Sequence, residues 1–164
     1  MSRLALVVLI AALAACGKSR PGGGPTADEL GAEAATFAQV LVPLSTQTLA
    51  GFEEAVKRNP SSVTAADFPL IYEAGYATID GRSVPVMVGY ANPWLAPADV
   101  IYQPMSVPQF LRACQSEGLD AVLIAPKGRI FISRLQLEDV RAKVVALGAP
   151  SSDMPFSFIR GNLR

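Results

Sequence analysis

The chain has 164 residues, with 14 basic and 14 acidic side chains, two cysteines and no histidine. The balanced charge gives no electrostatic basis for binding nucleic acid. Without histidine the chain lacks the usual general base near pH 7 and the commonest transition-metal ligand. We therefore expect neither a metal site nor a cofactor.

Residues 1–15 have the layout of a secretion signal. Arg3 precedes an apolar run, which ends in the motif Leu-Ala-Ala-Cys at Cys16. The run is shorter than the about 20 residues that a membrane-spanning helix needs. The order of residues resembles the lipobox of bacterial lipoproteins. That resemblance implies that Cys16 is lipidated and that the chain is cleaved just before it.

Residues 16–26 are predicted to be the lipidated cysteine and a flexible tether. Glycine and proline dominate this stretch and disfavour regular structure, and a linker of this length reaches about 15–20 Å on average. We expect Cys16 to anchor the protein to the bacterial cell membrane or the outer membrane. The folded part would then face the periplasm or the exterior.

A single folded domain is expected over residues 27–150, and its first element is predicted to be a helix. Thr26 and Glu29 have the spacing of a capping box. Apolar residues then recur at helical spacing over residues 30–44. Pro43 is expected to kink or end this helix.

A second helix is expected to begin at Ser45 or Thr46 and to stop at Asn59-Pro60. Apolar stripes of the width seen on both helices are usually core contacts, and we interpret them so. Partner-binding surfaces are the alternative. The stretch over residues 62–74 is ambiguous between a helix start and a loop.

Alternating apolar residues predict a β-hairpin next, with strands over residues 75–79 and 83–90. Asp80-Gly81 favours the positive φ angles of a tight type I′ turn. Pro85 indicates an edge position in the second strand, because proline has no backbone N–H to donate.

The sequence signals for secondary structure are clearest from Ser106 onward. Ser106 is predicted to cap a helix with Pro108 in its first turn, and Gly118 to end it. The other predicted elements are strands over residues 99–103, 121–125 and 129–133 and a helix over residues 137–147. The whole pattern predicts an α+β fold, with N-terminal helices followed by a small mixed sheet on which helices pack.

Two regions are candidates for binding a partner. Trp94, the only tryptophan, lies in a proline-rich loop and is either an exposed anchor or a lid on the core. The C-terminal tail over residues 151–164 is either an edge strand or a docking segment. If the protein has a hydrophobic partner surface, we expect it at Trp94, Phe156 and Phe158. Cys114 is predicted to be a buried apolar side chain, not a reactive thiol.

From residue 69 to residue 145 the chain resembles the amino-terminal domain of the SseB-like family, named for enhanced serine sensitivity. The resemblance is carried by Val84-Pro85-Val86, by Ser106 with Phe110-Leu111 and Cys114, and by the segment from Gly118 to Pro126 with Leu137-Glu138-Asp139 after it. The family usually has Asn-Pro where this chain has Ala-Pro. The resemblance implies an α/β fold and an interaction role, and it supplies no catalytic residues.

Two functions are compatible with these patterns. The first is a lipid-anchored, non-catalytic binding module of the cell envelope, with a protein partner or a small ligand. The second is an envelope enzyme that uses Asp120, Ser133 or other carboxylates in an unrecognised site. A cleft with a perturbed carboxylate would favour the enzyme, and an exposed apolar patch would favour the module. We favour the module.

Overall fold

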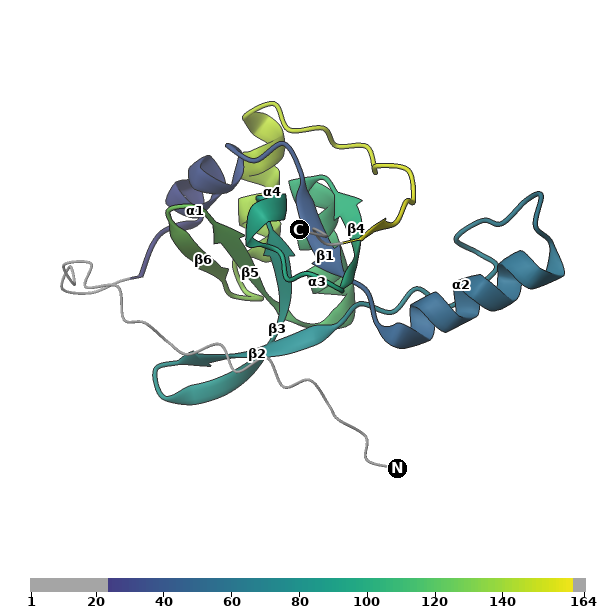
Figure 1. The fold of residues 1–164 in the computed structure, drawn as a ribbon. Coiled ribbons are helices and arrows are strands. Elements are labelled where there is room, and N and C mark those ends of the chain that lie inside the picture. The colour runs from purple at the N-terminus through teal and green to yellow at the C-terminus, as the bar shows by residue number, and fades with distance from the viewer. Residues whose placement is uncertain (1–23, 161–164) are drawn as a thin grey trace.

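The computed structural model describes residues 24–160 of the chain. The predicted signal over residues 1–15, Cys16 and most of the predicted tether lie outside the described residues. Within the described part, the chain forms four α-helices and a mixed seven-stranded sheet (Figure 1). This confirms the predicted α+β class.

The elements follow one another in this order: α1 (Ala27–Ala34), β1 (Val40–Pro43), α2 (Thr46–Arg58), β2 (Ala74–Ile79), β3 (Arg82–Tyr90), the 3-10 helix η1 (Pro93–Leu95), β4 (Ile101–Met105), α3 (Val107–Glu117), β5 (Asp120–Ala125), β6 (Gly128–Ile132), α4 (Leu137–Ala146) and β7 (Ile159–Arg160). The strand order in the sheet is β6-β5-β3-β1-β4-β7, and β2 pairs with β3 off this path. β3 and β5 are parallel, and all other pairs are antiparallel.

The prediction of one long first helix is wrong. The capping box of Thr26 and Glu29 forms as expected, but α1 ends at Ala34. Residues 40–43 form β1 in the interior of the sheet, where every residue is buried. Apolar residues at this spacing fit a helix face and a strand covered on both sides equally well, and β-branched valines favour the strand. A central strand therefore lies between the two N-terminal helices, which were expected to precede the sheet.

The hairpin forms as predicted. Asp80 and Gly81 both have positive φ angles, 49° and 74°, as a type I′ turn requires. β5 pairs with β3 only from Val86 onward, so at Pro85 the strand has a neighbour on one side alone, β2. This agrees with the edge position predicted from the proline.

The elements after Ser106 also agree with the prediction. The Ser106 hydroxyl caps α3, and Gly118 ends that helix in the left-handed conformation. The strand expected over residues 99–103 is shifted by two residues, to β4. The ambiguous stretch over residues 62–74 has no helix, and the Asp67 carboxylate accepts from the backbone N–H and the hydroxyl of Thr64 at 2.7 and 2.8 Å within a turn.

The sheet has an apolar core on each face. Side chains of α1, α3 and α4, such as Phe110 and Leu111, cover one face and contact alternate residues of β1, β3, β5 and β6. The other face carries Tyr90 and Tyr102 and is closed by the segment between β3 and β4, where Ala96 packs into the core. The Tyr102 hydroxyl donates to the Pro97 carbonyl at 2.9 Å, which ties this segment down.

One helix lies apart from both cores. Figure 1 shows α2 projecting away from the sheet, and only Thr48 and Ala55 of this helix are buried. Among residues 24–160, no helix has both the length and the apolar character needed to cross a bilayer.

Candidate functional site

A cavity of about 330 Å³ lies beside α3, at the edge of the sheet formed by β4, and it opens to solvent on one side. Its walls come from α3, from β4, from the loop before β2 and from the segment after α4. Apolar side chains such as Leu70, Met105 and Phe156 line it together with several polar ones. Its volume falls in the range of about 300–1,000 Å³ that is typical of small-molecule sites.

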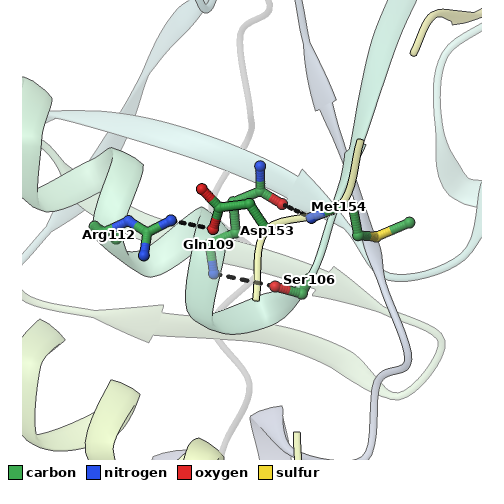
Figure 2. A network of polar contacts seen from close by, with 5 residues as sticks. All are labelled: Ser106, Gln109, Arg112, Asp153 and Met154. Carbon is green, nitrogen blue, oxygen red and sulfur yellow. Dashed lines mark hydrogen bonds and ion pairs between the residues drawn. The ribbon is translucent and has the colours of Figure 1, made fainter. Parts of the chain in front are cut away.

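The segment after α4 forms one wall, and we call residues 150–160 the C-terminal strap. Figure 1 shows the strap, in yellow, running from α4 to the outer edge of β4. Two polar contacts bind it to α3 (Figure 2): the Asp153 carboxylate pairs with the Arg112 guanidinium, and the Met154 N–H donates to Gln109 Oε1 at 3.0 Å. The strap ends as β7, paired with the first two residues of β4.

Gln103 is the most deeply buried polar group of the cavity wall, with a 3% exposed side chain. Its Oε1 accepts a hydrogen bond from the Tyr72 hydroxyl at 3.2 Å. Within residues 24–160 its amide nitrogen makes no hydrogen bond, although no fully buried side-chain nitrogen or oxygen there lacks a partner. The amide nitrogen is therefore not fully buried, and it has two N–H groups to donate at the cavity wall.

Tyr72 is held in its neutral form. Burial raises the pKa of Tyr72 to about 12, and the carboxylates of Glu117 and Asp153 add to the rise. At neutral pH the hydroxyl therefore keeps its proton and donates it to Gln103. The Tyr72 hydroxyl therefore orients the Gln103 amide.

The structure places the predicted partner-binding residues in two different settings. The Trp94 side chain in η1 is 78% exposed, so the ring is no lid on the core, and its backbone N–H donates to the Asn92 side chain at 2.9 Å. Phe156 and Phe158 are partly buried in the strap. Their ring contacts are with one another and with Phe52 and Phe68, at centroid distances of 4.6 to 6.2 Å.

The other candidates have structural partners. Cys114 lies in the core, and burial raises the pKa of its thiol, so the reactive thiolate is disfavoured. The Asp120 carboxylate accepts from the Arg134 backbone N–H at 2.7 Å. The Ser133 hydroxyl donates to Gln136 at 3.0 Å. Asp120 and Ser133 thus stabilise the turn that leads into α4. No group of three or more potential metal ligands occurs within residues 24–160.

Of the cavity residues, the sequence pattern singled out Phe156, as part of a partner surface and not of a cavity, and missed the polar ones. Gln103 was the available signal for a polar site. Apart from Tyr102, it is the one residue of β4 whose side chain can form hydrogen bonds. Arg112 reads as an ordinary polar residue on the solvent side of an amphipathic helix. Its partner Asp153 is 41 positions away, so no local pattern connects the two.

Comparison with protein-family models, with curated proteins and with solved structures finds no match to this chain. The resemblance to the SseB-like domain stays a prediction from its motifs.

Proposed function

We propose that this protein is a lipid-anchored, non-catalytic binding module of the bacterial cell envelope. The observation that carries the proposal is the position of Cys16. It ends a lipobox-like run and is separated from the cap of the first helix, Thr26, by a short tether rich in glycine and proline. The resemblance to the SseB-like domain adds an interaction role.

The second cysteine supports Cys16 as the modified residue. Cys114 has no exposed surface, lies on the face of α3 that packs on the sheet, and has a raised thiol pKa. An enzyme that modifies thiols would have to unfold the core to reach it. Substituting each cysteine in turn can thus show which of the two is modified.

The geometry of the domain suits a tether at one end and a partner at the other. The Gln136 side chain donates to the Pro25 carbonyl at 3.1 Å, which ties the end of the tether to the turn after β6. Trp94 follows the end of β3. Because β3 runs parallel to β5 and β6 antiparallel to it, the ends of β3 and β6 lie at opposite ends of β5. The exposed Trp94 ring is thus on the side away from the tether.

Lipid labelling tests the anchor. We would express the full chain in a bacterial host with an alkyne analogue of palmitate and follow the label and the membrane fraction. Wild type and Cys114→Ser are expected to carry the label and to sediment with the membrane, and Cys16→Ser to lose both properties. A labelled or membrane-bound Cys16→Ser variant would overturn the anchor assignment.

Cross-linking in intact cells tests the partner role. A protein partner is expected to be recovered with tagged wild type and lost with Cys16→Ser. Trp94→Ala is expected to reduce recovery, whereas Leu135→Ala, which removes another highly exposed apolar side chain, is the matched control. Equal recovery with both alanine variants would remove Trp94 from the partner surface. Phe156 and Phe158 are less suitable for this test, because their substitution also disturbs the strap.

A further inference from the structure

We propose that the cavity beside α3 binds an organic carboxylate with an apolar tail, and that Asp153 of the strap occupies the position of the ligand's carboxylate when the cavity is empty. This inference rests on the proposed function, because it names the class of ligand that the binding module takes.

Arg112 is the one basic side chain among the residues that line the cavity. A guanidinium presents N–H groups in a planar fork that matches a carboxylate. One Asp153 carboxylate oxygen now contacts one guanidinium nitrogen of that fork, and the Asp153 side chain is 53% exposed and that of Arg112 is 45% exposed. An ion pair this open to water is weak. A ligand carboxylate can therefore exchange with Asp153 at little loss.

The remaining polar groups of the cavity are mainly donors. Gln103 lines the cavity and its amide nitrogen has no hydrogen-bond partner among residues 24–160, and Gln109, whose Oε1 already accepts from Met154, has its own amide nitrogen left to donate. A carboxylate only accepts hydrogen bonds and satisfies such donors. A ligand with an ammonium group would find the one lining carboxylate, Asp153, already paired.

Charge couples ligand binding to the strap. Glu117 and Asp153 both act on this end of the cavity, since both raise the pKa of Tyr72. An anion that arrived while Asp153 stayed in place would be repelled by both carboxylates. If the ligand carboxylate replaces the Asp153 carboxylate, the charge beside Arg112 stays constant. Binding therefore requires the Asp153 side chain to leave Arg112, while the contact of the Met154 N–H with Gln109 can stay in place.

The volume and the apolar wall set the size of the ligand. A volume of about 330 Å³ lies at the low end of the range of roughly 300–1,000 Å³ that small-molecule sites have, which favours a small organic acid. We take octanoate as the probe, with the carboxylate at Arg112 and the tail against Leu70 and Met105.

Equilibrium dialysis tests the proposal. We would place the full chain in lipid nanodiscs, dialyse it against radiolabelled octanoate, and subtract the signal of empty nanodiscs. Octanamide, which is neutral and has the same size, serves as the competitor. Octanoate is expected to bind, and octanamide to compete about two- to five-fold less well, because it loses the ion pair with Arg112.

Three variants locate the site. Arg112→Gln is expected to weaken octanoate binding about two- to five-fold, and Arg112→Lys, which keeps the charge, to weaken it less. Arg141→Gln is the control, because Arg141 pairs with Glu138 on α4, away from the cavity wall. Asp153→Asn removes the internal carboxylate and is expected to tighten binding about two- to five-fold.

The outcomes separate this inference from the proposed function. Equal binding by wild type and Arg112→Gln, equal binding of octanoate and octanamide, or weaker binding by Asp153→Asn would each overturn it. Palmitate labelling of the same preparation reports the anchor independently. A labelled protein without Arg112-dependent binding keeps the anchor and loses the ligand class. Arg112-dependent binding by an unlabelled protein keeps the ligand class and loses the anchor.

Discussion

Helices α2 and α3 begin in the same way, with a serine N-cap whose hydroxyl accepts the N–H of the third helical residue at 3.3 Å. Both are amphipathic, with 13 and 11 residues. α3 buries Phe110, Leu111 and Cys114 under the sheet, whereas α2 projects from it (Figure 1). The comparison teaches that local signals start a helix, but that its place in the fold decides how much apolar surface it removes from water.

α2 is held by a small set of contacts near the cavity. The buried Thr48 hydroxyl donates to the Ile71 carbonyl at 3.0 Å and accepts the Ile71 N–H at 2.8 Å, which joins α2 to the loop before β2. Phe52 joins it to the strap through Phe158, at 4.6 Å between ring centroids. We expect α2, that loop and the strap to open together at a lower free energy than the core.

The largest expected difference is between two phenylalanines. Phe110→Ala in α3 is expected to lower the free energy of unfolding by about 3–5 kcal/mol, because it leaves a cavity in the core. Phe52→Ala in α2 removes edge-to-face ring contacts of a partly buried side chain and is expected to lower it by about 1 kcal/mol. Urea unfolding followed by circular dichroism measures both. Equal losses would show that α2 belongs to the main core.

The next effect tests the joint between α2 and the loop. Thr48→Val keeps the shape of the side chain but leaves the Ile71 N–H without its partner, whereas the Ile71 carbonyl still accepts from the Ser45 N–H at 2.9 Å. The variant should destabilise the protein by about 1–2 kcal/mol. Thr48→Ser retains the hydroxyl and is the control. The same unfolding experiment applies, and a loss with serine as large as with valine would mean that the methyl group matters more than the hydrogen bonds.

The N-cap residues of the two helices, Ser45 of α2 and Ser106 of α3, test the same difference between the helices. Ser106→Ala is expected to lower the free energy of unfolding by about 1 kcal/mol. Ser45→Ala should change the global value less, since α2 opens before the core does. It should instead speed hydrogen exchange of the α2 amides, which mass spectrometry resolves by segment. Faster exchange in α3 after Ser45→Ala would contradict the independence of the two regions.

A further effect appears only in alkaline solution, at Tyr72, which lies in the cavity wall between the two regions. Its pKa is about 12 in the folded protein and 10.0 ordinarily. The folded state thus holds this proton more tightly, so its contribution to stability is complete below pH 10 and is lost between about pH 10 and pH 12. Tyr72→Phe should make stability fall less steeply over that range, as measured by urea midpoints at successive pH values. Parallel curves for the two proteins would refute the buried, neutral hydroxyl.

Much of the fold was predictable because its signals are short-range. The Asp80-Gly81 turn and the Ser106 and Gly118 caps act within a few residues, and all formed where expected. β1 was missed because its three apolar residues fit a helix stripe and a buried strand alike. Only pairing with β3 and β4 decides between the two structures.

The candidate site was not predictable for a related reason. Arg112, Gln103 and Asp153 come from a helix, a strand and the strap, and each has an ordinary local pattern. Phe156 and Phe158 looked like an apolar tail ready for a partner, yet their rings contact Phe52 and Phe68 of the same chain. Contacts over such separations carry no periodicity that a sequence pattern can reveal.

By itself the sequence determined the α+β class, the turns and caps of the second half of the domain, and the lipobox-like motif at Cys16, because each depends on neighbouring residues and on the properties of single side chains. The tertiary structure alone decided that residues 40–43 are a central strand, that α2 lies apart from the core, and that the strap closes a cavity around Gln103 and Arg112. These features depend on which distant segments bury each other's surface, and that is settled only when the whole sheet assembles.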